Sequence, residues 1–163
     1  MAVKIIVFSL MTFLHDLFTV IWMGGLIVTA ISLMPALKDA LGPGPQLKKV
    51  MASFQKRQSI WVYISMVGLI LTGVVMTHRS PDFEHLFGWG NPYSVALSIK
   101  HILVLIMIAI TLYRNLVFGG KHSSPTPQKD RLNRMLLLVN VALAVLVLLV
   151  SGLVAAFNSP IHG

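Results

Sequence analysis

The chain has 163 residues, of which 56% are hydrophobic and only 11% are charged. Soluble domains carry about 25% charged residues, so the composition excludes a soluble enzyme, a disordered chain and a typical basic nucleic-acid-binding domain. Cysteine is absent, which excludes disulfides, thiolate metal sites and cysteine nucleophiles, and the net charge of +8 must be explained by its distribution along the chain.

Four apolar segments predict an all-α, integral membrane four-helix bundle that forms a single transmembrane domain over residues 1–163. The third segment begins at Pro92, a residue favoured in the first turn of a helix, and the fourth carries no charge from Met135 to Phe157. The expected spans are about 5–37, 58–78, 92–114 and 133–157.

The basic residues predict how the bundle is oriented in the membrane. They gather in the loops after the first and third spans: Lys38, Lys48, Lys49, Lys56 and Arg57, then Arg114, Lys121, Lys129, Arg131 and Arg134. The positive-inside rule therefore places these two loops in the cytoplasm and both termini outside (N-out/C-out). We expect a multi-pass protein of the cell inner (plasma) membrane. Its expected partner is the lipid bilayer, and no nucleic acid is expected to bind.

A few ionisable residues lie inside the predicted spans, where they are energetically costly and therefore functional candidates: His15, Asp16, Lys100 and His101. Helix rise places His15 and His101 at similar depths in the predicted outer half, on stripes expected to face the bundle interior. Asp16 is expected either to receive protons or to neutralise Lys100 or Arg79. The alternative interpretation of the two histidines is a hydrogen bond from each to a neighbouring helix.

Two imidazoles from separate helices of a bundle are suitable axial ligands for haem b. The hypothesis is a haem b protein that carries electrons, with His15 and His101 on the iron. Lys100 and Arg79 would lie near the propionates and Trp22 against the porphyrin. Such a membrane oxidoreductase would use a quinone and a redox partner or a larger membrane complex.

A second metal hypothesis uses softer ligands. Met76, His78 and His85 place a thioether and two imidazoles near the outer end of the second span, and this donor set suits copper. A structural subunit of a larger membrane complex, with no ligand of its own, is a third alternative.

Several short segments give the chain a family resemblance. They are Leu14-His15, Trp22-Met-Gly-Gly25, Phe54 and Arg57, Leu71-Thr-Gly73, Pro92-Tyr93, Leu97-Ser-Ile-Lys100, Leu103-Val104 and Asn115. With these segments the chain resembles the membrane domain of copper resistance protein D (the CopD-like family). The resemblance implies a helical bundle linked to copper uptake or tolerance across the inner membrane. The opening segment is also similar to that of four-helix protoporphyrinogen oxidases (HemJ-like), in which a histidine of the first span is associated with haem.

Overall fold

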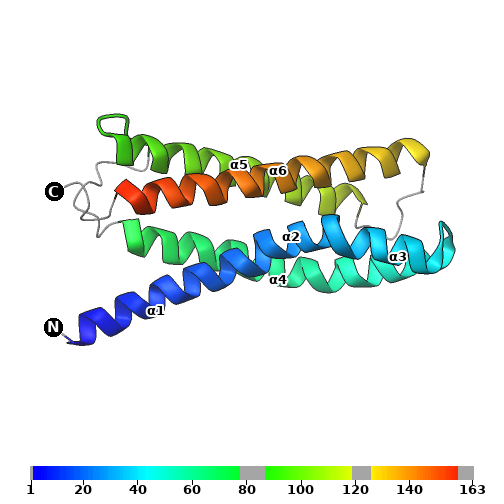
Figure 1. Ribbon diagram of the computed structural model, residues 1–163, viewed down its shortest axis with the longest axis horizontal. Coiled ribbons are helices and arrows are strands. Elements are labelled where there is room, and N and C mark those ends of the chain that lie inside the picture. The colour runs from blue at the N-terminus through cyan, green and yellow to red at the C-terminus, as the bar shows by residue number, and fades with distance from the viewer. Residues whose placement is uncertain (1, 78–86, 119–125, 158–163) are drawn as a thin grey trace.

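The computed structural model describes residues 2–77, 87–118 and 126–157, and these residues are almost entirely helical (Figure 1). The first rod consists of α1 (Ala2–Thr19), η1 (Val20–Gly24), α2 (Gly25–Val28), η2 (Thr29–Leu33) and α3 (Met34–Leu41). Three single helices follow: α4 (Pro45–Thr77), α5 (Pro92–Phe118) and α6 (Pro127–Phe157). The predicted all-α class is confirmed.

Each of the three single helices begins at a proline, whose fixed φ and missing N–H suit the first helical turn. The start of α5 at Pro92 agrees with the prediction. In contrast, α4 begins at Pro45 rather than near residue 58, and α6 at Pro127 rather than near residue 133. Apolar character identifies only the part of a helix that lipid can cover, whereas backbone hydrogen bonding continues through the charged turns beyond it.

The first rod contains two π-helical segments, η1 and η2. In η2 the N–H of Met34 donates to the carbonyl of Thr29, five residues back, just before Pro35. Proline lacks an N–H, so the carbonyl four residues before it loses its usual hydrogen-bond donor. The hydrogen bonds of this turn then join residues five apart instead of four. Hence Pro35 does not break the rod, which continues to Leu41.

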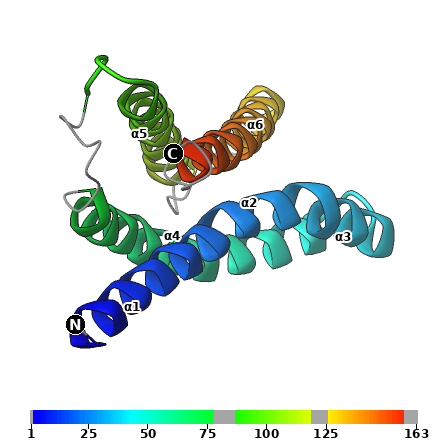
Figure 2. The ribbon, with the colours of Figure 1, turned by 60° about the vertical axis from the view of Figure 1, so that its left-hand side comes forward.

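The helices form two antiparallel pairs (Figure 2). One pair is α5 with α6, and the other is the first rod with α4. The pairs meet where η1, α2 and η2 of the first rod contact α6. The residues of the resulting apolar core include Trp22, Met23, Leu26, Val62, Met66, Leu69, Met107, Leu137, Ala144 and Val147.

The outer surface of the bundle suits lipid. All four helical rods are long and apolar enough to cross a bilayer, over Val3–Leu41, Pro45–Met76, Pro92–Phe118 and Pro127–Phe157. Large apolar side chains such as Val67, Leu71 and Leu149 are exposed on this surface. Because water would make such exposure costly and lipid would not, the chain is a multi-pass membrane protein.

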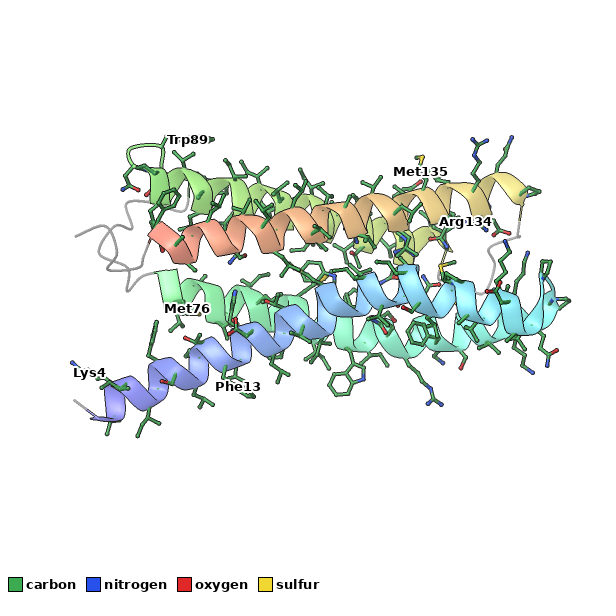
Figure 3. All side chains as sticks on the ribbon, viewed as in Figure 1. Lys4, Phe13, Met76, Trp89, Arg134 and Met135 are labelled. Atoms are coloured by element: carbon green, nitrogen blue, oxygen red, sulfur yellow. The ribbon has the colours of Figure 1, made fainter. Side chains whose placement is uncertain are left out.

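The two ends of the bundle differ in charge. The start of α1 and the end of α6 lie together at one end, here called the terminal end, with Lys4 and Met76 (Figure 3). The opposite end carries α3, the start of α4, the end of α5 and the start of α6, and is here called the basic end. It bears most of the lysines and arginines. The assignment of the terminal end to the outside of the cell remains a prediction.

A buried amide crosses between α5 and α6 in the core. The Nδ2 of Asn140 donates to the Oγ1 of Thr111 at 2.9 Å, while its Oδ1 has no hydrogen-bond partner. Hydrogen bonds between membrane helices contribute about 0.6 kcal/mol on average. We therefore expect Asn140→Leu to change the free energy of unfolding in detergent by less than about 1 kcal/mol. A much larger loss would contradict this small contribution of the Asn140–Thr111 hydrogen bond.

Candidate functional site

His15 of α1 is held against α4. Its Nδ1 lies 2.9 Å from the Oγ1 of Thr72, a buried residue, and the Thr72 hydroxyl is 2.7 Å from the carbonyl of Gly68. Because the hydroxyl proton is donated to Gly68, the threonine oxygen accepts the Nδ1–H of His15. This assignment leaves the Nε2 of His15 with a free lone pair, as a metal-ligating imidazole requires.

His101 of α5 has the same tautomer but a different partner. Its Nδ1 donates to the carbonyl of Leu97 on its own helix at 2.8 Å, since a carbonyl can only accept. The ring meets that of Phe87 edge to face, with centroids 6.4 Å apart. The Nε2 of His101 is therefore also the unprotonated nitrogen. Its Nδ1 stays on its own helix, whereas that of His15 reaches across to α4.

The charged neighbours of His15 lie on two helices. Lys100 of α5 is half-buried and interacts electrostatically with His15 and Asp16 of α1. Asp16 is exposed on its rod. Within residues 2–77, 87–118 and 126–157 the only ion pair shorter than 4 Å joins Lys48 to Asp130, so Asp16 and Lys100 do not form a direct salt bridge.

Met76 lies on the same face of α4 as Thr72. The two residues are four positions apart, which places them one above the other about 6 Å along the helix. Met76 is half-buried and lies in the last turn, at the terminal end (Figure 3). The thioether is therefore one turn beyond the hydroxyl that holds His15.

Three predicted site residues, His78, Arg79 and His85, lie outside the described residues. Trp22 is fully buried in the core, and its indole Nε1 has no hydrogen-bond partner. It stands seven residues after His15, about 10 Å further along the rod. Within the parts of the chain that the structure describes, no three His, Cys, Asp or Glu side chains gather as metal ligands.

Two further residues belong to the polar groups described here, Thr72 and Arg114, and the sequence pattern alone does not identify them. Thr72 lies four residues after Gly68, on a helix face whose small and polar residues suit helix packing, and nothing local indicates that it would hold His15. Arg114 was expected in a basic loop, but α5 extends to Phe118 and buries it. The signal was present: Met107, Thr111 and Arg114 have the four- and three-residue spacing of one helix face, and all three are buried.

Comparison with known proteins identifies a family. The family model described as "CopD: Copper resistance protein D" matches residues 49–157. No curated protein and no solved structure matches the chain.

Proposed function

Because the chain belongs to the copper resistance protein D family, we propose that it handles copper in the membrane and binds copper(I) at the terminal end of the bundle. The proposed ligands are the Nε2 of His15 and the thioether of Met76, with His78 as a third donor. In this proposal copper is the substrate that the protein handles and not a resident cofactor. The observation that carries the proposal is the hydrogen bond from His15 to Thr72, which holds the imidazole against α4 one turn from Met76.

The donor set matches the chemistry of copper(I). Thioether sulfur is a soft ligand that selects this ion, and imidazole is a common copper ligand. The hydrogen bond at the Nδ1 of His15 orients the ring and raises the basicity of the Nε2, as partners of metal-bound histidines do. His85 is a further candidate ligand from the segment between α4 and α5.

The direct test is copper content after purification in a reducing buffer containing copper(I). We expect about one copper per chain in the unaltered protein and a loss of most of it in Met76→Leu, because leucine keeps the volume but has no lone pair. Met66→Leu is the matched control, since Met66 lies on the same helix but is buried in the core. Equal copper in both variants would contradict the proposal, and no metal at all would favour a structural subunit.

Haem b, with His15 and His101 as axial ligands, is a second candidate. The observation in its favour is that both histidines use their Nδ1 in hydrogen bonds, which leaves both Nε2 atoms free for iron. Lys100 and Arg79 would then serve the propionates, Trp22 would pack near the porphyrin, and the group would carry electrons for a quinone or another redox partner. A Soret band after haem-replete expression, lost in His15→Ala and in His101→Ala, is the expected signature.

Lys100 distinguishes the two candidates by the sign of its effect. Its ammonium interacts electrostatically with His15 and therefore opposes a cation bound there. If copper is the ligand, Lys100→Gln should tighten copper(I) binding about three- to tenfold in a competition titration with a chromogenic chelator. If haem is the ligand, the same change removes a partner of the propionates and should weaken haem retention.

A further inference from the structure

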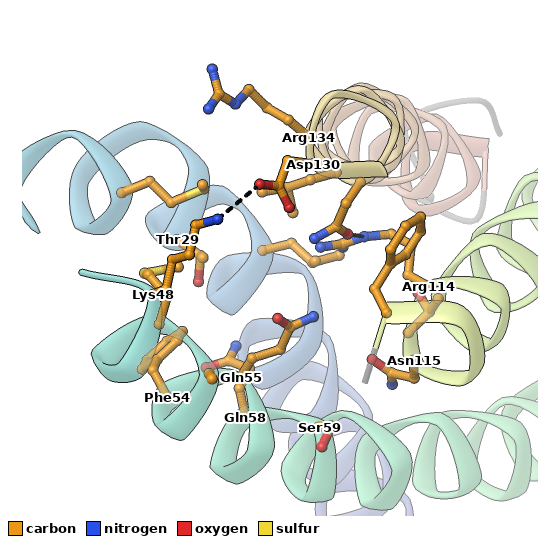
Figure 4. A pocket seen from close by; sticks show the side chains of 18 of the residues that line it. Thr29, Lys48, Phe54, Gln55, Gln58, Ser59, Arg114, Asn115, Asp130 and Arg134 are labelled. Atoms are coloured by element: carbon orange, nitrogen blue, oxygen red, sulfur yellow. Dashed lines mark hydrogen bonds and ion pairs between the residues drawn. The ribbon is translucent and has the colours of Figure 1, made fainter. Parts of the chain in front are cut away.

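A cavity lies at the basic end, away from the histidines. Its volume is about 450 Å³, and α2, α4, α5 and α6 all contribute to its wall (Figure 4). Ligand pockets typically measure about 300–1,000 Å³, so the cavity is large enough for a small molecule or for part of a lipid. None of the residues proposed above as metal ligands lines it.

The strongest feature of this cavity is Arg114 of α5. Its side chain is 9% exposed, and its Nε donates to the Oδ1 of Asn133 on α6 at 2.9 Å. No carboxylate pairs with its guanidinium within the described residues. The one carboxylate in the cavity wall, that of Asp130, already binds the Nζ of Lys48 at 3.3 Å. Residues 119–125, which follow α5, contain no Asp or Glu.

A buried guanidinium without a counter-ion is costly in a membrane protein, because the charge is neither hydrated nor paired. Arg114 lies one turn from the end of α5, where an arginine could instead extend toward water. Instead it turns inward to Asn133 and lines the cavity. An anion in the cavity would complete its coordination.

The rest of the wall has the character of an anion site with an apolar side. Lys48, Lys129 and Arg134 join Arg114 in the lining, against the single carboxylate of Asp130. Other lining residues, such as Leu26, Val62 and Leu137, are apolar and buried.

Gly25 makes room for a polar side chain that lines the cavity. A methyl group built on this residue would overlap the side-chain amide of Gln58, so the absence of a side chain lets the amide approach α2. Gln58 therefore reaches the cavity from α4.

We propose that this cavity binds the phosphate group of an anionic amphiphile, with the guanidinium of Arg114 as its principal partner. Arginine recognises phosphate through paired, charge-assisted hydrogen bonds, and basic pockets between membrane helices bind lipid headgroups. The combination of cationic and apolar walls favours a phospholipid over a small hydrophilic anion. A soluble phosphate compound shares the same chemistry and is separated from lipid by the experiment below.

The full chain is reconstituted in bilayers of equal parts phosphatidylglycerol and phosphatidylcholine, extracted in mild detergent, and analysed for retained lipid by native mass spectrometry. We expect retention of phosphatidylglycerol over phosphatidylcholine, and a loss of about tenfold or more in Arg114→Gln. Arg131→Gln is the control, because Arg131 is exposed on α6 and does not line the cavity. Equal retention of the two lipids, or equal retention by the two variants, would overturn the proposal.

A pair of adjacent lysines tests the site without altering a buried residue. Lys48 and Lys49 are both exposed on α4, but only Lys48 lines the cavity. We expect Lys48→Gln to lower phosphatidylglycerol retention about threefold or more, since it also frees the carboxylate of Asp130, and Lys49→Gln to leave it unchanged. If Arg114→Gln does not fold, the comparison of Lys48→Gln with Lys49→Gln tests the proposal on its own. Equal phosphatidylglycerol retention by these two variants overturns the proposal.

Inorganic phosphate identifies the source of the anion. It is titrated into the protein in bilayers of phosphatidylcholine alone, and binding is measured by calorimetry. No phosphate binding, together with selective retention of phosphatidylglycerol, assigns the site to lipid. Phosphate binding that Arg114→Gln and Lys48→Gln both weaken, without selective lipid retention, overturns the assignment to a lipid and assigns the site to a soluble phosphate compound. The absence of both selective lipid retention and phosphate binding overturns the proposal.

Discussion

Thr72→Val is expected to weaken copper(I) binding by about ten- to a hundredfold, although Thr72 is not itself a proposed ligand. The valine keeps the shape of the buried side chain but removes the oxygen that accepts the Nδ1–H of His15. The ring is then free to rotate and to change tautomer, so the lone pair of Nε2 is no longer directed by the protein. A chelator competition titration of the purified protein measures the change.

Two controls separate this positioning effect from a loss of structure. Thr72→Ser retains the hydroxyl and should retain most of the copper affinity. Thr111→Val removes an equivalent threonine from the other pair of helices. Like Thr72, Thr111 donates to the backbone carbonyl four residues back, and its hydroxyl accepts a hydrogen bond, in this case from Asn140. This substitution should leave copper binding unchanged. Wild-type affinity in Thr72→Val would show that His15 needs no orienting partner and would remove the main support for the site.

Gly68→Ala is expected to be the most destabilising small substitution in the bundle. A methyl group built at this position overlaps the ring of Phe18 on α1, so either this ring or the first rod must shift. Overpacking of this kind costs about 1–3 kcal/mol. Thermal or denaturant unfolding in detergent measures the loss, and copper binding should weaken as well because His15 lies one turn from Phe18 on the same rod.

Gly152→Ala is the matched control for this substitution. No atom lies within 4 Å of a methyl group built at that position on α6, so the change should be neutral or should stabilise the helix by up to about 1 kcal/mol. Combining Gly68→Ala with Phe18→Leu should recover part of the lost stability, since leucine occupies less of the space near Gly68. Unchanged stability in Gly68→Ala alone would mean that α1 and α4 are not in the described contact.

The two proposed sites lie at opposite ends of the bundle, and this separation makes their tests independent. Met76 lies at the terminal end (Figure 3), and His15 is held by Thr72 one turn before it, whereas Arg114 and Lys48 line the cavity at the basic end. A variant of one site should therefore leave the ligand of the other unaffected. Loss of both ligands from a single substitution would instead indicate a disturbed fold.

The amino-acid sequence was sufficient for the membrane-spanning character, the number of helices and the family. These properties depend on local quantities: the apolar length of each segment, the proline at a helix start such as Pro92, and short motifs such as Leu97-Ser-Ile-Lys100, which lies within the matched residues 49–157. Helices α4 and α6 begin before the predicted spans at 58 and 133, because hydropathy detects where lipid covers a helix and not where its hydrogen bonding begins.

Only the tertiary structure decided which side chains meet. A helical stripe contains His15, but the rotation of each rod and its tilt against the next depend on contacts along all four rods at once. For that reason Thr72 was not identified as the partner of His15, and Arg114 was assigned to a loop although it is buried beside Asn133. Interhelical geometry is a collective result of packing, so a single segment of sequence does not contain it.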